Sequence, residues 1–179
     1  MSALVVAILA GGLSSRMGQD KRFLKINGVS LLDKAIFLAK QLDGQVLICG
    51  AVPGRVCLPD KTAQRGPISG LLSAVHTIQK PVWLLVLPVD MPLLTLDLLK
   101  NLFTRAEKPG VAYQNYELPL LFWCDKNAVS ILERLERWSV RAFLEALGAK
   151  RLSLDTALES CFMNLNCPED WERLHEYSI

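Results

Sequence analysis

Apolar residues in the first hundred positions fall into short continuous runs and into longer stretches with helical spacing. Three runs contain no polar residue, which is typical of strands that are buried on both faces of a parallel sheet. They span residues 4–10, 46–49 and 82–87. In the stretches that follow these runs, apolar residues recur at the period of a helix. The helices predicted there cover residues 32–42, a segment that opens at Gly66-Pro67, and residues 96–103.

This alternation of strands and helices predicts the fold class. Successive strand–helix–strand units build a parallel sheet through right-handed crossovers, and the helices cover both of its faces. We therefore expect an α/β fold with a Rossmann-like, doubly wound and mostly parallel sheet.

The pattern in the second half of the chain is less regular. Two strands, at residues 110–114 and 117–123, are expected at an antiparallel edge or on a flap that faces substrate. One or two helices are expected over residues 129–147, followed by short strands at Leu152 and Phe162 and by a last helix from Pro168 onward. No repeat, low-complexity tract or linker interrupts the pattern, so we expect a single domain over residues 1–179.

Composition and charge exclude several classes of protein. The 179 residues are 51% hydrophobic and carry a formal net charge of +2. Disordered chains have low hydrophobicity and high net charge, so this chain is expected to fold. Binding to nucleic acid needs clustered cations, and no run of five like charges occurs, so no nucleic-acid partner is expected.

The cysteines and histidines argue against a disulfide framework and against a histidine-rich metal site. The five cysteines are scattered, odd in number and without a C-x-x-C pair. Reduced thiols of this kind fit a cytoplasmic location. The two histidines, His76 and His175, lie far apart in the sequence. Any divalent cation is therefore expected on carboxylate and phosphate oxygens.

Neither of the two most apolar stretches is expected to be a targeting or membrane segment. The stretch near Met1 lacks the cationic region of a secretory signal, and we interpret it as a buried strand. The stretch at residues 82–94 is short and is interrupted by Pro88, Asp90 and Pro92, so it is not expected to span a membrane.

The segment at residues 9–21 carries the most chemical information. It follows the first predicted strand, at the edge where open α/β sheets bind ligands. Its glycines allow the backbone N–H groups to approach a phosphate, and Arg16 and Lys21 add two cations. Its glycine spacing matches neither the dinucleotide fingerprint nor the P-loop. From these residues alone, a triphosphate cradle and a flexible loop with incidental charges both remain open.

Four motifs in this order resemble those of the MobA-type molybdenum cofactor guanylyltransferases, which are nucleotidyltransferases with a Rossmann-like core. The first motif is specific, and the others are weak singly but informative together. The motifs are Leu9-Ala10-Gly11-Gly12-x-Ser14-x-Arg16-Met17-Gly18-x-Asp20-Lys21, Gly66-Pro67-Ile68-Ser69-Gly70-Leu71, Pro88-Val89-Asp90-Met91-Pro92 and Asn164-Leu165-Asn166-Cys167-Pro168-Glu169-Asp170. The chain departs from the family pattern at three positions. Some members have Asn in place of Cys49, the family often has Gln in place of Leu118, and it usually has Thr in place of Cys167.

The resemblance implies a fold like that of the nucleotide-diphospho-sugar transferases and a definite reaction. GMP would pass from Mg-GTP to molybdenum-molybdopterin, which gives the molybdopterin guanine dinucleotide cofactor and pyrophosphate. The implied partners are GTP, molybdenum-molybdopterin, molybdopterin-handling proteins and apo-molybdoenzymes, with Mg²⁺ as cofactor. A cytidylyltransferase for the same cofactor, a nucleotidyltransferase for another phosphorylated acceptor, and a nucleotide-binding chaperone of molybdoenzymes remain open. The presence of both Lys21 and Asp90 argues against the chaperone.

Candidate site residues follow from the motifs and the resemblance. Asp90 lies in a proline-bounded turn after a buried strand, where one carboxylate together with phosphate oxygens would suffice for Mg²⁺. The other reading of Asp90 is a helix cap, for which Thr95 or Asp97 is better placed. Arg16 and Lys21 are expected to stabilise charge during transfer. The remaining expected nucleotide contacts are Leu9, Ala10, Gly11, Gly12 and Asp60.

Three of the candidate residues have a structural explanation that is about as good. Asp60 follows an apolar stretch at residues 56–58, interpreted as a strand, and it could bind nucleotide or lie in a solvated turn. Asn164 and Asn166 alternate, which places both amides on one face, suited to the acceptor's phosphate or pterin. The other reading of this Asn pair is an Asx-turn before the last helix.

Overall fold

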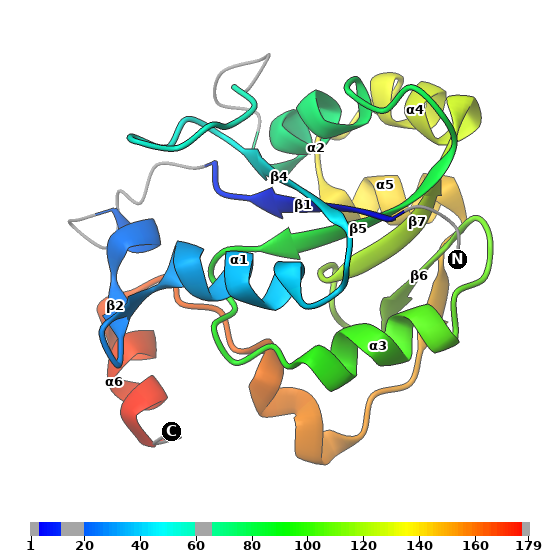
Figure 1. Ribbon diagram of the computed structural model, residues 1–179. Coiled ribbons are helices and arrows are strands. Elements are labelled where there is room, and N and C mark those ends of the chain that lie inside the picture. The colour runs from blue at the N-terminus through cyan, green and yellow to red at the C-terminus, as the bar shows by residue number, and fades with distance from the viewer. Residues whose placement is uncertain (1–3, 12–19, 60–65, 177–179) are drawn as a thin grey trace.

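A six-stranded sheet forms the centre of the computed structural model, which describes residues 4–11, 20–59 and 66–176. The strand order is β4-β1-β5-β7-β6-β8 (Figure 1). The strands are β1 (Leu4–Leu9), β4 (Gln45–Cys49), β5 (Val82–Pro88), β6 (Gly110–Tyr113), β7 (Leu120–Cys124) and β8 (Lys150–Leu152).

Strand polarity divides the sheet into two parts. β1 pairs in parallel with both β4 and β5. β7 is antiparallel to both β5 and β6, and β6 is parallel to β8. Within this sheet as described, β7 alone runs against the other strands. The mostly parallel sheet and the antiparallel element in the second half are therefore as predicted.

Helices cover both faces of the sheet. α2, α4 and α5 lie on one face, and α1 and α3 lie on the other (Figure 1). The helices are α1 (Leu31–Lys40), α2 (Pro67–Val75), α3 (Leu96–Thr104), α4 (Lys126–Glu133), α5 (Val140–Leu147) and α6 (Pro168–Glu176). The described residues also form two 3₁₀ helices, η1 (Lys21–Phe23) and η2 (Thr156–Phe162). Among the described helices, none is long and apolar enough to cross a bilayer.

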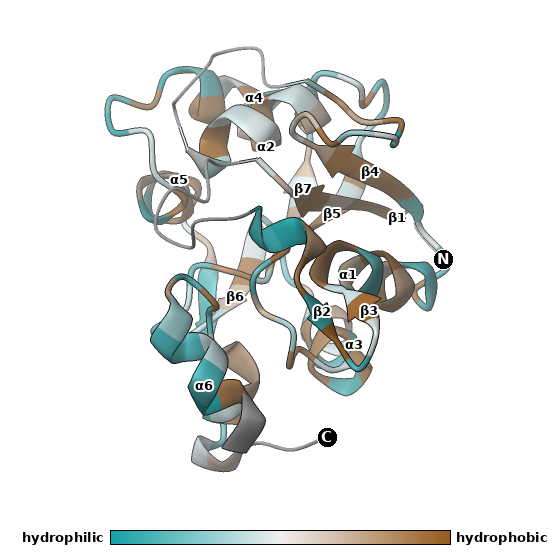
Figure 2. Ribbon diagram, turned by 90° about the vertical axis from the view of Figure 1, so that its left-hand side faces the viewer, coloured by the Kyte–Doolittle hydropathy of each residue, from teal (hydrophilic) through white to brown (hydrophobic). Residues whose placement is uncertain are grey.

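The central strands are apolar throughout because each contributes side chains to two cores. Val5, Ala7 and Leu9 of β1 pack under α2, whereas Val6 and Ile8 pack toward α1 and α3. Figure 2 shows the resulting contrast between the hydrophobic strands β1, β4 and β5 and the hydrophilic residues of α6. Two-sided burial is the physical reason for the uninterrupted apolar runs.

Two predicted strands are wrong. Phe162 lies at the end of η2, because Asp155 accepts a hydrogen bond from the N–H of Ala157 and starts a 3₁₀ turn there. Residues 56–58 form no named strand, and Leu58 makes only an isolated bridge to Cys49. Val56, which is 98% exposed, has no core to pack against.

A short hairpin precedes α1 and was not predicted. It consists of β2 (Lys25–Ile26) and β3 (Val29–Ser30), paired in antiparallel. The residues between them, Asn27 and Gly28, have φ values of 52° and 80°. Positive φ at both positions is what a tight two-residue hairpin turn requires, and Asn-Gly is its strongest sequence signal.

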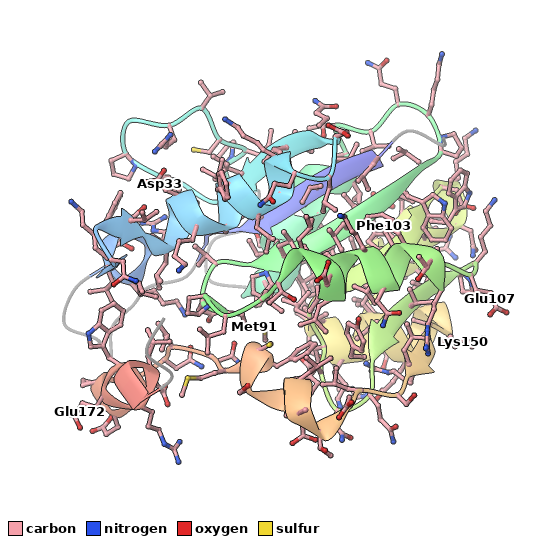
Figure 3. The ribbon with its side chains drawn as sticks, turned by 60° about the horizontal axis from the view of Figure 1, so that its bottom comes forward. Asp33, Met91, Phe103, Glu107, Lys150 and Glu172 are labelled. Atoms are coloured by element: carbon pink, nitrogen blue, oxygen red, sulfur yellow. The ribbon has the colours of Figure 1, made fainter. Side chains whose placement is uncertain are left out.

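Long-range ion pairs on the surface add little to the stability of the fold. Figure 3 shows Lys150, at the start of β8, beside Glu107 in the segment before β6. Their Nζ and Oε2 atoms are 2.5 Å apart, and both side chains are more than half exposed. A solvent-exposed pair of this kind contributes at most about 1 kcal/mol. The apolar layers therefore dominate the stability of this region.

Gly50 allows the end of β4 to pass against the segment that follows β1. Its φ is +110°, and a Cβ placed there would lie 2.5 Å from the backbone N of Gly11. Both the backbone conformation and the close approach therefore require a glycine at this position.

We expect Gly50→Ala to lower the free energy of unfolding by about 2 kcal/mol or more, because backbone strain and backbone contact add together. Gly28→Ala is the matched control, since Gly28 also has positive φ but a Cβ there meets nothing within 4 Å. It should lower that free energy by only about 1 kcal/mol, from the left-handed backbone alone. Urea unfolding of both variants measures the difference. Equal losses would show that the contact with Gly11 does not matter.

Candidate active site

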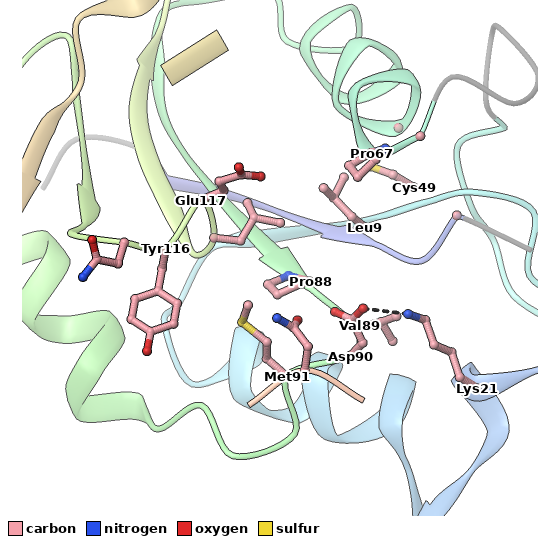
Figure 4. Close-up of a pocket in the computed structure, with 16 residues that line it drawn as sticks. Leu9, Lys21, Cys49, Pro67, Pro88, Val89, Asp90, Met91, Tyr116 and Glu117 are labelled. Atoms are coloured by element: carbon pink, nitrogen blue, oxygen red, sulfur yellow. Dashed lines mark hydrogen bonds and ion pairs between the residues drawn. The ribbon is translucent and has the colours of Figure 1, made fainter. Parts of the chain in front are cut away.

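A cavity of about 470 Å³ lies at the carboxyl ends of β1, β4 and β5 (Figure 4). These strands end together because Leu9 of β1 is in register with both Cys49 of β4 and Pro88 of β5. The start of α2, including Gly66, Pro67 and Gly70, completes this part of the lining. The cavity thus lies where open α/β sheets generally bind their ligands.

A larger groove of about 930 Å³ lies between α1 and the loop that follows β5. Its lining is mostly apolar and includes Phe37, Leu38 and Leu94. Phosphate groups need cations and N–H donors rather than an apolar surface. The smaller cavity is therefore the better candidate for phosphate chemistry.

Lys21 and Asp90 form an ion pair in the lining of the smaller cavity. Lys21 begins η1, which is capped by Asp20, whereas Asp90 lies in the turn after β5. The Nζ of Lys21 lies 2.6 Å from Oδ2 of Asp90, and the two side chains are 17% and 18% exposed. Figure 4 shows this pair on one side of the cavity. A cation and a carboxylate from two predicted motifs therefore meet at one point.

Asn166 is the third member of this cluster. The Nζ of Lys21 also donates a hydrogen bond to Oδ1 of Asn166, at 3.2 Å. The backbone N–H of Leu165 donates to the carbonyl oxygen of Asp90, at 2.9 Å. The C-terminal motif is thus bound directly to the turn that carries Asp90, although 75 positions separate Asp90 from Leu165 in the sequence.

Asp90 is not the cap of the next helix. Thr95 caps α3, and its side chain accepts a hydrogen bond from the N–H of Leu98. Thr95 was one of the two residues that the sequence favoured for this task. The Asp90 carboxylate is therefore available to the cavity.

The start of α6 fixes the position of Asn166. The Asp170 carboxylate accepts hydrogen bonds from the N–H groups of Asn166, at 2.8 Å, and Cys167, at 3.0 Å. The hydrogen bond from the Asn166 N–H is the main reason why the pKa of Asp170 lies below its usual value. Cys167 is a weak helix cap, and Asp170 supplies the reciprocal contact of a capping box from the third helical position.

The opposite wall of the cavity comes from the turn between β6 and β7. This turn, residues 115–118, carries Tyr116 and Glu117, which Figure 4 shows across the cavity from Lys21. The ring of Tyr116 stacks on Phe162 with centroids 4.1 Å apart, and Arg151 Nη1 donates to the Tyr116 carbonyl oxygen at 2.8 Å. The wall is therefore braced from η2 and β8.

The structure brings most of the predicted site residues together. Leu9, Gly11, Lys21, Asp90 and Asn164 line the cavity, and Asn166 joins them through Lys21. Ala10 is buried beside the cavity, and its carbonyl oxygen accepts a hydrogen bond from Arg22. Gly12, Arg16 and Asp60 lie outside the described residues.

Arg22 and Tyr116 were not singled out in the sequence. No local pattern distinguishes either residue, because each acquires its position through contacts with distant parts of the chain.

Comparison with known proteins supports the same fold. Residues 6–153 match the family described as the MobA-like NTP transferase domain. A molybdenum cofactor guanylyltransferase of Xanthomonas euvesicatoria is 35% identical over 176 residues, which cover 94% of this chain and 93% of that protein.

Two solved structures have the same fold. The molybdopterin-guanine dinucleotide biosynthesis protein A of Archaeoglobus fulgidus superposes with a TM-score of 0.71 at 23% identity, over 97% of each chain. The 2-C-methyl-D-erythritol 4-phosphate cytidylyltransferase of Thermus thermophilus superposes with a TM-score of 0.67 at 18% identity, over 98% of each chain. These matches confirm the predicted α/β fold, similar to that of the nucleotide-diphospho-sugar transferases. With the family match over most of its length, the chain belongs to the MobA-like NTP transferases and is a nucleotidyltransferase.

Proposed function

We propose that the protein transfers GMP from GTP to the terminal phosphate of molybdenum-bound molybdopterin and releases pyrophosphate. The observation that carries this proposal is the cluster of Lys21, Asp90 and Asn166 at the cavity edge, in a chain 35% identical to a molybdenum cofactor guanylyltransferase. The cluster joins the glycine-loop motif, the carboxylate turn and the C-terminal Asn motif.

The reaction needs no protein nucleophile. An oxygen of the acceptor phosphate attacks the α-phosphorus of GTP, and a new P–O bond forms. The bond from the α-phosphorus to the oxygen that bridges to the β-phosphorus breaks, and that oxygen leaves with the electron pair on pyrophosphate. The cavity lining fits this reaction, because its described residues include Cys49 but no histidine or serine, and therefore no Cys-His or Ser-His pair.

Alignment and charge neutralisation then supply the catalysis. Lys21 is placed to neutralise phosphate oxygens at the donor side of the cavity, and we assign the same task to Arg16. Leu9 and Gly11, in the lining, and Ala10 beside them lie where the nucleotide phosphates would pass the end of β1. We assign further nucleotide contacts to Gly12 and Asp60.

Asp90 is the residue that we propose as the Mg²⁺ ligand. Within the described residues, no group of three or more His, Cys, Asp or Glu is arranged to hold a metal, so phosphate oxygens would have to supply further ligands. The second carboxylate oxygen of Asp90, Oδ1, accepts no hydrogen bond from the described residues, so an oxygen ligand faces the cavity. One carboxylate together with phosphate oxygens is a typical Mg²⁺ set. When bound, Mg²⁺ would neutralise charge on the triphosphate.

We assign the acceptor to the part of the cavity that is lined by Asn164 and by the turn at residues 115–118. Asn164 lines it from the C-terminal motif, and its amide can both donate to and accept from a pterin or a phosphate. Asn166 was expected beside it at the acceptor, but its side chain reaches Lys21 instead. We therefore keep Asn164 as the acceptor residue and place Asn166 with the donor.

We propose that the reaction takes place in the cytoplasm. Cys57, Cys124, Cys161 and Cys167 are free thiols, as expected in a reducing compartment. Burial raises the pKa of Cys124 to about 12, so this thiol stays protonated and unreactive. Molybdopterin-handling proteins would supply the acceptor, and apo-molybdoenzymes would receive the product.

An assay with each nucleotide tests the function directly. The purified protein is incubated with Mg²⁺, molybdenum-molybdopterin and one of GTP, CTP, ATP or UTP. We expect pyrophosphate and the dinucleotide product with GTP, at a rate at least about tenfold above that with the other nucleotides. Turnover with CTP alone would identify a cytidylyltransferase. Nucleotide binding without pyrophosphate release would identify a chaperone instead.

Asp90→Asn should lower the transfer rate by about a hundredfold or more, because the carboxylate charge is lost from the site of charge development. The fold should persist, since an amide oxygen can still accept from Lys21. Asp43→Asn is the matched control, because Asp43 is an exposed loop residue with φ of 52°, a value that Asn also tolerates. Pyrophosphate release measured for Asp90→Asn within a few-fold of wild type would overturn the assignment of Asp90.

The two asparagines should separate donor binding from acceptor binding. Asn166→Ala removes an acceptor of the Lys21 ammonium and should raise the KM for GTP by about three- to tenfold. Asn164→Ala should raise the KM for molybdopterin by a similar factor and leave that for GTP unchanged. Asn127→Ala, on the exposed surface of α4, is the control. Identical kinetic effects of the two site variants would contradict this division of the cavity.

A further inference from the structure

Arg22 lies where the ends of β1 and β4 meet. Its Nη1 donates hydrogen bonds to the carbonyl oxygen of Ala10, at 2.9 Å, and to that of Ala51, at 2.6 Å. Ala10 directly follows β1, near the start of the glycine-loop motif, whereas Ala51 follows Gly50. The same guanidinium therefore holds the two backbone segments that approach each other at Gly11 and Gly50.

Arg22 also binds Asp20, near the end of the glycine-loop motif. Its Nε donates to Oδ1 of Asp20, at 2.8 Å, and to Oδ2, at 3.0 Å, and its Nη2 donates to Oδ2 at 2.5 Å. Asp20 Oδ1 further accepts from the backbone N–H of Arg22, at 3.1 Å. One side chain thus contacts both residue 10, near the start of this motif, and residue 20, near its end.

These contacts distinguish Arg22 from a phosphate ligand. Nε, both hydrogens of Nη1 and one hydrogen of Nη2 already have partners among the described residues. The hydrogen bonds to Asp20 are the main reason why the pKa of Arg22 is raised, and those from Arg22 are the main reason why the pKa of Asp20 is lowered. Only 14% of the Arg22 side chain is exposed. The guanidinium is therefore a charged and largely enclosed bridge with little capacity left for a ligand.

We propose that Arg22 is a positioning residue for nucleotide binding. It acts through Asp20, Ala10 and Ala51, and it sets Lys21, its neighbour in η1, against Asp90. The inference rests on the proposed function, because it concerns the GTP side of the same cavity. The planar guanidinium of an arginine can donate hydrogen bonds to a carboxylate and to two carbonyl oxygens at the same time. The ammonium of a lysine cannot make these parallel hydrogen bonds.

Two substitutions and a chemical rescue test the proposal. Arg22→Lys keeps the positive charge but loses the planar guanidinium, and Arg22→Ala loses both. In calorimetric titrations with GTP, we expect the affinity of each variant to fall by about tenfold or more, the effect of losing charge-assisted hydrogen bonds. The KM for molybdopterin should stay within about twofold of wild type, because the hydrogen bonds of Arg22 go to Ala10, Ala51 and Asp20 and not to the residues assigned to the acceptor. Ethylguanidinium, and not ethylammonium, should restore part of the GTP affinity of Arg22→Ala.

Arg55→Lys is the matched control, because Arg55 also pairs with a carboxylate, that of Asp33 at 2.5 Å, but its side chain is 46% exposed. Its GTP affinity should equal that of wild type. Wild-type GTP affinity in Arg22→Lys would overturn the proposal, as would an equal rise of the KM for both substrates. If Arg22→Ala fails to fold, the GTP affinity of Arg22→Lys alone tests the proposal. A wild-type protein that binds neither GTP nor CTP would instead refute the proposed function itself.

Discussion

The parallel pairing of β1 with both β4 and β5 is the constraint on which the site depends. Leu9 lies in register with Cys49 on one side and with Pro88 on the other. The segments that follow β1, β4 and β5 therefore leave the sheet at the same edge and at the same level along the strands. Every described feature of the donor side follows from this arrangement: the close contact of Gly50 with Gly11, the bridge made by Arg22, and the turn that presents Asp90.

The reversal at β7 adds the other side of the cavity. Because β7 runs against β5 and β6, the turn between β6 and β7 reaches the edge where β1 and β5 end. That wall contains no helix start and no glycine-rich motif. It is held by stacking of Tyr116 on Phe162 and by Arg151, so the two walls of one cavity have different supports. The segment at residues 162–166 contacts both walls, because Phe162 stacks on Tyr116 and Asn166 accepts from Lys21.

The sequence predicted those elements whose burial decides their pattern. The apolar runs at β1, β4 and β5 were correct to within about one residue at each end, because strands buried on both faces tolerate no polar residue. The hairpin at Asn27-Gly28 escaped notice, although its turn signal was present, because its strands are only two residues long. Phe162 was wrongly assigned to a strand, because a single apolar residue shows no periodicity. The cap at Asp155 starts a 3₁₀ helix that ends at Phe162 instead.

The chemistry of the site was predictable where motifs carry it and not where side chains meet over long distances. Lys21 and Asp90 were identified, and the structure joins them. The contact of Lys21 with Asn166 spans 145 positions, and no local pattern shows which of two alternating amides a lysine will reach. Arg22 was missed for a related reason: its sequence context is that of a solvated charge, and only the folded ends of β1 and β4 give it partners.

The docking of Leu165 and Asn166 onto Asp90 and Lys21 has a consequence for synthesis on the ribosome. A nascent chain that has emerged only as far as α5 already contains β1, β4 and β5, which can pair. It still lacks the amide that accepts from Lys21 and the N–H that binds the Asp90 turn. A chain that terminates early would therefore hold most of the sheet with an unfinished donor site. Completion of the cavity therefore waits for residues that are translated well after the three strands.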